Sequence, residues 1–211
     1  MIITKFGHSC FLAEEKGVKM LFDPGNFTVA QNDVWGVDLI LVTHEHQDHL
    51  DVASLKSVLA KNPGAKVITN KGVGALLDKE SIKYDLLEHG QSLTYKGVLI
   101  EAFGKEHAVI YPTLPTVSNT GYFIANRLFF PGDAFVNPGK PVEILALPAN
   151  APWSNIRETI DYAREIGAKV AFPVHDGLLK KPEFIPRFLG GILGALGVKL
   201  VPIEIGKPTE F

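Results

Sequence analysis

Residues 39–51 constrain this chain more than any other stretch, because an apolar run leads directly into Thr-His-Glu-His-Gln-Asp-His. The apolar run is too short for an independent helix and predicts a buried strand. If the chain stays extended for a few residues after this strand, the side chains of His44 and His46 point to the same side. Asp48 and His49 follow where the chain must turn, so they can diverge from that pair.

These side chains form a candidate metal site. Imidazole and carboxylate groups are ligands that divalent metals such as zinc accept. Three of the seven histidines fall within residues 44–49, a density that a solvated polar loop does not explain. The stretch can direct two imidazoles to one metal position, and a carboxylate with an imidazole to a second metal position nearby. A site with two metals needs about three further ligands from elsewhere in the chain.

Apolar runs, alternation and helical spacing divide the chain into short elements. After the histidine stretch, strands alternate with helices, which indicates an α/β arrangement in that half. The expected strands cover residues 2–6, 9–14, 18–22, 39–42, 66–69, 83–87, 92–95, 98–103, 118–125, 127–130, 143–148, 169–174 and 199–205. The expected helices cover residues 51–60, 71–79, 153–166, with Ser154 as N-cap, and 182–197. No linker or low-complexity run interrupts them, so we expect one domain over residues 1–211.

Several further polar side chains follow expected strands. Asp23 ends the third strand, where it either closes an Asx-type turn or accepts a hydrogen bond from a metal-bound imidazole. His8 lies between the first two strands and either reaches a site or caps a turn. His107 stands just past a strand end and would be unremarkable alone. His89 lies in a turn and is interpreted as a surface histidine.

The His44-x-His46-x-Asp48-His49 pattern resembles the signature of the metallo-β-lactamase superfamily. His107, a Gly-Asp pair ending at Asp133, and His175 follow in the superfamily's order, so the resemblance covers nearly the whole chain. It implies an α+β protein, a four-layer αββα sandwich of two mixed β-sheets flanked by helices. It also implies a first metal held by His44, His46 and His107, a second held by Asp48, His49 and His175, and Asp133 as the bridge between them.

A narrower resemblance concerns one branch of the superfamily. Gly7-His8-Ser9, the strand Asn119-Thr120-Gly121-Tyr122 and the compact length resemble the branch that includes L-ascorbate-6-phosphate lactonase. Residues 147–153 and 172–176 are similar to proteins described as metal-dependent hydrolases. The resemblance therefore implies a hydrolase with two divalent metal ions per chain. Zinc is the expected ion, and manganese and iron remain open, because His and Asp ligands accept all three.

The chemistry expected of such a site is hydrolysis of a small-molecule ester, lactone or phosphoester. Two ions about 3.5–4 Å apart share a hydroxide and supply a nucleophile at neutral pH. Asp133 would bridge the ions, and Asp48 could also accept a proton. Asp176 either orients a ligand or caps the following helix. Asn150 and Trp153 are expected to line the pocket, although Trp153 fits the core of the following helix equally well.

Composition limits the partners. The chain has 211 residues and a net charge of −2, without a basic excess for nucleic-acid binding. The longest apolar segment that could suggest a membrane span, residues 188–198, is too short for one. With no signal peptide visible, we expect a cytoplasmic enzyme that acts on a small molecule without nucleic acid or membrane, with homo-oligomerisation left open. The single cysteine, Cys10, excludes an internal disulfide and is interpreted as a buried apolar residue.

Other functions remain open beside the hydrolase. The same ligand set can hold two irons in redox enzymes of this fold that use oxygen or thiols, and iron with oxygen consumption would reveal them. A non-catalytic metal-binding protein would bind metal and hydrolyse nothing. A nuclease of this fold usually adds a basic arm or an extra domain, which this chain lacks. The complete ligand set favours the hydrolase.

Overall fold

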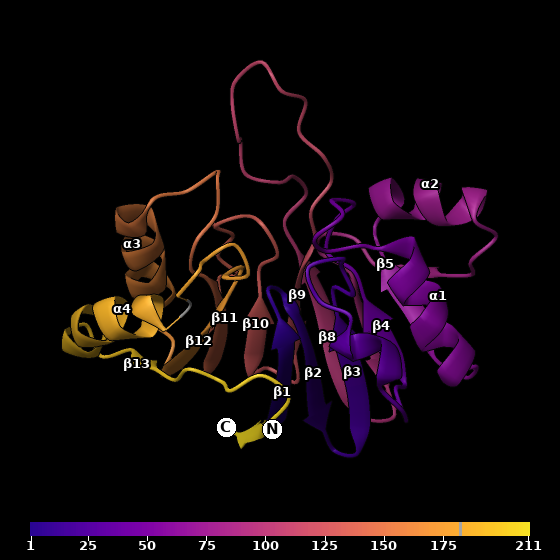
Figure 1. Cartoon of the computed structure of the whole chain (residues 1–211), viewed down its shortest axis with the longest axis horizontal. Helices are drawn as coiled ribbons and strands as arrows, with labels where there is room; N and C mark the ends of the chain where they lie inside the picture. Colours follow the sequence, from indigo (N-terminus) through magenta and orange to yellow (C-terminus); the bar gives the residue numbers. More distant parts are fainter. Residues whose placement is uncertain (182) are drawn as a thin grey trace.

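The computed structural model describes residues 1–181 and 183–211. Two seven-stranded β-sheets pack face to face, and two helices cover the outer face of each sheet (Figure 1). The order of layers is therefore helix, sheet, sheet, helix. This is the α+β sandwich that the resemblance implies.

The first sheet is built mainly from the N-terminal half of the chain. Its strands, in spatial order, are β14 (Pro208–Glu210), β1 (Ile2–Gly7), β2 (Cys10–Glu15), β3 (Val18–Phe22), β4 (Leu39–Leu41), β5 (Lys66–Thr69) and β6 (Asp85–Leu86). The strands from β3 to β6 are parallel, and β1, β2 and β3 are antiparallel neighbours. Helices α1 (Val52–Lys61) and α2 (Lys71–Lys79) bury apolar side chains such as Leu55 and Leu77 against this sheet.

The second sheet comes from the C-terminal half. Its strands, in spatial order, are β13 (Lys199–Leu200), β12 (Val170–Val174), β11 (Ile144–Pro148), β10 (Leu128–Phe130), β9 (Gly121–Ile124), β8 (Val98–Phe103) and β7 (Ser92–Tyr95). Helices α3 (Ile156–Ile166) and α4 (Phe184–Ala195) cover its outer face through residues such as Tyr162 and Leu189. A short 3-10 helix, η1 (Ala30–Asp33), lies between β3 and β4.

The core between the two sheets contains a cluster of aromatic rings. Phe11 and Phe22 of the first sheet stack with their ring centroids 4.5 Å apart. Phe130 and Phe172 of the second sheet each meet the Phe11 ring edge to face at 5.3 Å. Such aromatic contacts add about 0.5–1.5 kcal/mol each beyond the area that they bury. They fix the two sheets against each other and thereby the edge where both sheets supply polar residues.

Strand direction determines which residues can meet at that edge. In the first sheet β1, β3 and β4 run in the same direction, and in the second sheet β8, β10 and β12 do so. The carboxyl ends of parallel strands lie at the same edge of a sheet. Every candidate site residue before Asn150 follows one of these strands, and His175 follows β12.

Five details differ from the sequence predictions. Asn155, and not Ser154, is the N-cap of α3, because its side chain accepts hydrogen bonds from the second and third amides of the helix. Trp153 lies in the turn before that helix. The strand expected over residues 199–205 is limited to β13, and the strand expected over 83–87 to β6. Strand β14 was not predicted.

Other predictions are confirmed. Cys10 is a free, buried cysteine, and His89 lies on the surface, where its Nδ1 accepts a hydrogen bond from the Gly104 amide. Among the described residues, no helix is long and apolar enough to cross a membrane.

Candidate metal centre

Six of the seven histidines gather with three aspartates at the carboxyl ends of the strands. Their ligand atoms form overlapping groups in which all atoms lie within 4.8 Å of one another, close enough to share a metal ion. The groups are His44, His46 and His107; His8, Asp48, His49 and His175; and Asp23, His44 and His49. The first two groups each combine residues from both sheets.

The chain after β4 supplies four of these side chains. His44 and His46 come first, and their ring centroids lie 4.8 Å apart. The chain then turns, with the amides of His49 and Leu50 donating to the carbonyl oxygen of His46 at 2.9 and 2.8 Å. This turn places Asp48 and His49 in the second group, and the ring centroid of His49 stays 4.0 Å from that of His44. The arrangement follows the divergence that the sequence predicts.

Asp23 orients two of the imidazoles, one directly and one through Thr43. This fully buried carboxylate accepts hydrogen bonds from His49 Nδ1 at 2.6 Å and from the Thr43 hydroxyl and amide at 2.7 and 2.8 Å. Because the Thr43 hydroxyl proton goes to Asp23, its oxygen accepts from His44 Nδ1 at 3.0 Å. Asp23 therefore fixes the tautomers of both His44 and His49, with the proton on Nδ1.

Backbone carbonyls orient two further imidazoles in the same way. His107 Nδ1 donates to its neighbour, the Ala108 carbonyl oxygen, at 2.5 Å. His175 Nδ1 donates to the Asn150 carbonyl oxygen at 2.7 Å. A carbonyl can only accept, so both rings carry their proton on Nδ1. Asn150 thus contributes to the site through its backbone.

The opposite nitrogens of these rings suit a metal ion. The Nε2 atoms of His44, His49 and His107 are buried and have no hydrogen-bond partner among the residues that the structure describes. A buried polar atom without a partner is costly. An imidazole that donates from Nδ1 and presents an Nε2 lone pair is the usual form of a metal-binding histidine. The donor set therefore fits a divalent metal.

Asp133 lies between the two groups. Its Oδ1 is 3.2 Å from His49 Nε2, and its Oδ2 is 3.4 Å from His107 Nε2 and 2.9 Å from His175 Nε2. The indole nitrogen of Trp153 donates to Oδ2 at 2.9 Å. Trp153 is therefore in direct contact with the centre and does not belong to the core of α3.

Gly132 allows Asp133 to reach this position. Its φ is +65°, a left-handed conformation that glycine adopts readily. A Cβ atom at Gly132 would lie 2.3 Å from the Asn119 Oδ1 and 2.8 Å from the Thr43 Cβ. The Asn119 oxygen accepts the Asp133 amide at 3.0 Å. Glycine therefore precedes Asp133 because neither the φ nor the space at position 132 suits a residue with a side chain.

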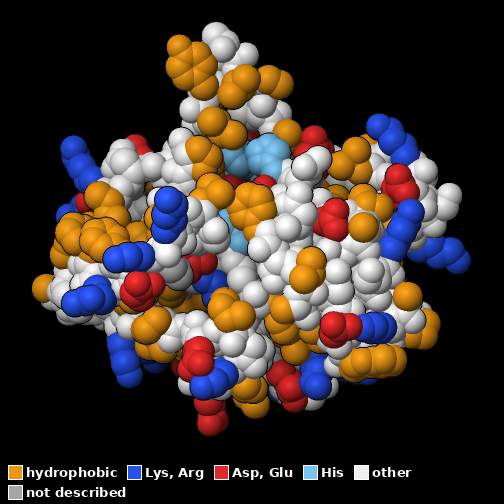
Figure 2. All heavy atoms as spheres, in the orientation of Figure 1, with side chains coloured by type: hydrophobic (Ala, Val, Ile, Leu, Met, Phe, Trp, Pro, Cys, Tyr) orange, Lys and Arg blue, Asp and Glu red, His pale blue; other side chains and the backbone are white. Residues whose placement is uncertain are grey.

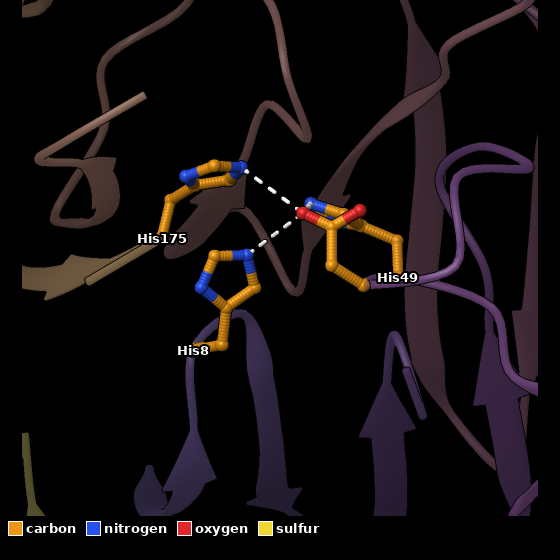
Figure 3. A group of neighbouring side chains, drawn as sticks. His8, His49 and His175 are labelled. Atoms are coloured by element: carbon orange, nitrogen blue, oxygen red, sulfur yellow. Dashed lines mark hydrogen bonds and ion pairs between the residues drawn. The ribbon is translucent and has the colours of Figure 1, made fainter. Parts of the chain in front are cut away.

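The second group surrounds the carboxylate of Asp48. Figure 3 shows the imidazoles of His8 and His175 pointing toward one carboxylate oxygen. Asp48 Oδ2 is 3.0 Å from His8 Nε2, 3.4 Å from His175 Nε2 and 3.7 Å from His49 Nε2. The three imidazoles come from different elements, the β1–β2 turn, the loop after β4 and the end of β12, and converge on one point.

The charges in the cluster are strongly coupled. Burial opposes protonation of His175, but Asp133 and Asp48 outweigh it and raise the pKa of His175 to about 9. Burial acts likewise on His49, yet Asp133 and Asp23 raise its pKa well above the usual value. Burial raises the pKa of Asp133, and His49 and His175 reverse this and hold it well below the usual value. Burial and the neighbouring His49 lower the pKa of His44.

Asp176 lies apart from this cluster. Its Oδ2 accepts a hydrogen bond at 2.6 Å from Lys5 Nζ, a buried ammonium that also donates to the Pro173 carbonyl. The interpretation of Asp176 as a cap of the following helix is wrong, because α4 begins only at Phe184. No local pattern predicts this pair, which joins β1 to the end of β12 across 171 residues.

Apolar surface borders the centre on two sides. The segment between β8 and β9 rises above the sheets, and histidine side chains are visible in the hollow beneath it (Figures 1 and 2). Ile110 and Leu114 of this segment line a narrow pocket with His46 and His107. A cavity of about 600 Å³ lies against His8 on another side.

Comparison with known proteins supports a common ancestry. Residues 2–175 match the family described as Beta-lactamase superfamily domain. The chain belongs to the metallo-β-lactamase superfamily. Its narrower resemblance to the ascorbate-6-phosphate lactonase branch stays a prediction.

Relatives within the superfamily extend over most of the chain. Protein Rv0786c of Mycobacterium tuberculosis is 38% identical over 184 residues, 85% of each chain. A protein of Methanocaldococcus jannaschii named UPF0173 metal-dependent hydrolase is 24% identical over the whole of both chains. The solved structure of Igni18, a metallo hydrolase from Ignicoccus hospitalis, has a TM-score of 0.78 at 21% identity and covers 100% of this chain and 98% of its own. This last similarity concerns the fold.

Proposed function

We propose that this metal-dependent hydrolase of the metallo-β-lactamase superfamily cleaves an ester, lactone or phosphoester bond in a small molecule with the help of two divalent metal ions. His44, His46 and His107 would hold the first ion, and Asp48, His49 and His175 the second. Asp133 would bridge them. One observation carries the proposal: two sets of ligand atoms converge from both sheets and share the carboxylate of Asp133.

Two ions at this centre would lower the pKa of water toward neutrality and polarise the bond under attack. The protein's own residues supply the rest. Asp133 is held by Trp153 and by its backbone contact with Asn119, so its two oxygens stay directed at the two groups. The side chain of Asp48 is 21% exposed, compared with 4% for Asp133. Asp48 is therefore the carboxylate better placed to accept a proton from water during hydrolysis.

Zinc is the ion that we propose first. The ligands are imidazole nitrogens and carboxylate oxygens, which zinc, manganese and iron all accept. The first group contains only imidazoles, which favours zinc or iron over manganese, since manganese prefers oxygen ligands.

The surroundings support a small substrate with an apolar portion. Ile110 and Leu114 line the pocket beside His46 and His107. Val109 and Tyr111 on the same segment are 58% and 62% exposed. A substrate whose reactive bond lies at the ions would place neighbouring carbon atoms against this segment. Burial of apolar surface there would favour binding by about 25 cal/mol per Å².

The first test is elemental analysis of freshly purified, untagged protein. We expect about two zinc ions per chain, as a dinuclear centre requires. The variants Asp133→Ala and His46→Ala should each retain less metal. His89→Ala is the matched control, because it removes a surface imidazole that is a member of none of the three ligand groups found among the described residues. Wild-type metal content in both site variants would show that the centre is misassigned.

The second test is turnover of lactones, aryl esters and phosphodiesters by the zinc-loaded protein. Hydrolysis of at least one class, lost in Asp133→Ala and kept in His89→Ala, is the expected result. Two bound irons with oxygen consumption would instead support the redox alternative. Full zinc occupancy without hydrolysis of any class would favour a non-catalytic metal-binding protein.

A further inference from the structure

His8 differs in the role of its Nδ1 atom from four other imidazoles of the centre, which we call the anchored imidazoles because each donates a hydrogen bond from Nδ1. They are those of His44, His49, His107 and His175. The backbone amide of Gly177 donates to His8 Nδ1 at 3.1 Å. An amide N–H can only donate, so Nδ1 must present its lone pair. In a neutral imidazole the proton then lies on Nε2. That Nε2 is 3.0 Å from Asp48 Oδ2, which accepts the proton in a hydrogen bond.

The four anchored imidazoles have the opposite tautomer. His44, His49, His107 and His175 all donate from Nδ1, so Nε2 is the nitrogen that each of these rings can offer to a metal ion. Distance alone places His8 in a group that could hold a metal, together with Asp48, His49 and His175. Its Nε2 carries a proton, whereas a metal-binding imidazole must present a lone pair at the nitrogen that faces the ion. His8 is therefore a donor within a group of acceptors.

The fold holds His8 firmly in this orientation. Its side chain is buried, and its ring packs against Phe27 and His175 at centroid distances of 4.7 and 4.2 Å. Its backbone has a φ of +48°, a left-handed conformation that is uncommon outside glycine. Its carbonyl oxygen accepts the His175 amide at 3.2 Å. Both the backbone and the ring of His8 are thus bound to the segment that carries His175.

Gly177 is matched to this contact. A Cβ atom at Gly177 would lie 3.0 Å from both the Cβ and the Nδ1 of His8. The absence of a side chain lets the backbone amide approach the imidazole closely enough to donate. A rotation of the ring by half a turn would place a carbon atom opposite this amide and lose the bond.

We propose that His8 is a positioning residue of the centre and not a metal ligand. Its Nε2–H holds Asp48 Oδ2 at the point that faces His49 and His175, and this oxygen would bind the second ion. Because Oδ2 is engaged, the other oxygen of Asp48 is the one that accepts a proton from water. The inference rests on the proposed function for the role of Asp48, whereas the tautomer of His8 follows from the hydrogen bonds alone.

The direct test is nitrogen NMR of protein labelled with ¹⁵N-histidine, in the metal-free and the zinc-loaded state. Long-range proton–nitrogen correlations distinguish the two tautomers of each ring. We expect His8 to carry its proton on Nε2 in both states, while the four anchored rings carry theirs on Nδ1 when zinc is bound. The His8→Gln variant assigns the signal. A His8 ring that loses its Nε2 proton on zinc binding would overturn the proposal.

A second test compares zinc binding of matched variants. In His8→Gln the side-chain amide can still donate to Asp48, so we expect about two zinc ions per chain and near wild-type affinity. His8→Ala lacks the donor, and we expect zinc affinity at the second site to fall about 10–100-fold, the usual effect of losing a partner of a metal ligand. Zinc affinity that is lost in His8→Ala and kept in His8→Gln would show that the hydrogen bond to Asp48 matters, and not only the volume of the side chain.

His175→Gln is the reference for loss of a true ligand. If His8→Gln lost one zinc ion per chain as His175→Gln does, His8 would be a ligand and the proposal would be wrong. Wild-type protein that binds no zinc would refute the proposed function instead. The metal-free NMR experiment would then still decide the tautomer of His8.

Discussion

The anchored imidazoles direct Nε2 toward the carboxylates of the centre. A metal ion and a proton compete for each of these lone pairs, because a ligating imidazole must be deprotonated at Nε2. In the metal-free protein the carboxylates favour the proton, which is why the pKa values of His49 and His175 are raised. The residues that would bind the second ion are therefore those that hold protons most tightly without it.

Zinc affinity at the second site is expected to fall as the pH falls below about 9. The pKa of His175 is about 9 in the metal-free protein, so near neutral pH zinc must displace its proton. Each displaced proton lowers the apparent affinity about tenfold per pH unit below that pKa. Competition with a chelator at several pH values would measure this dependence. An affinity that did not change with pH would contradict it.

Residues of the centre differ in how far the sequence could predict them. The spacing of His44, His46, Asp48 and His49 is local, so strand periodicity and turn chemistry were enough to separate the two pairs. The partners of Asp133 are not local, because Trp153 reaches it across 20 residues. The tautomer of His8 depends on an amide 169 residues away. No local pattern could reveal these contacts.

At the scale of elements, the start of α3 shows where the sequence left two choices. Asn155 forms a capping box, in which its side chain accepts two helix amides and Glu158 accepts the Asn155 amide. Ser154 is an equally good cap residue by type. Where two adjacent residues can cap, the preceding turn decides, and here that turn contains Trp153, which is fixed by its bond to Asp133.

Asn155→Ala should therefore lower the free energy of unfolding by about 1 kcal/mol, the usual cost of removing a cap. Ser154→Ala is the matched control and should change stability little, because Ser154 lies one residue before the cap. Urea unfolding of the two variants would give both values. A larger loss in Ser154→Ala would contradict the assignment.

Edge strands were the least predictable elements. Strand β14 consists of Pro208, Thr209 and Glu210, which show neither an apolar run nor alternation. It is a strand because its backbone pairs with β1, the other end of the chain, which a periodicity argument does not detect. The central strands were predicted well, since burial on both faces gives them continuous apolar runs.

At the scale of the whole molecule, each proposed ion would join the two sheets. His44 and His46 follow β4 of the first sheet, while His107 follows β8 of the second. Asp48 and His49 likewise come from the first sheet and His175 from the second. Bound metal would thus add coordination bonds between the two sheets, which the aromatic rings of the core also hold together.

Removal of metal should consequently destabilise the protein. A ligand present at a thousand times its dissociation constant stabilises the folded state by about 4 kcal/mol. We expect the thermal midpoint of zinc-loaded protein to fall clearly after treatment with a chelator. Asp133→Ala is the control, because a chelator should shift its midpoint much less. An unchanged wild-type midpoint would show that metal contributes nothing to stability.

The bond between Trp153 and Asp133 also gives the centre a natural optical reporter. The chain has two tryptophans, and Trp35 is 66% exposed on the surface. In Trp35→Phe the remaining indole fluorescence comes from Trp153, whose N–H touches the proposed bridging carboxylate. Paramagnetic manganese should quench this emission during titration, and zinc should only shift it. Equal responses to both ions would place Trp153 outside their reach.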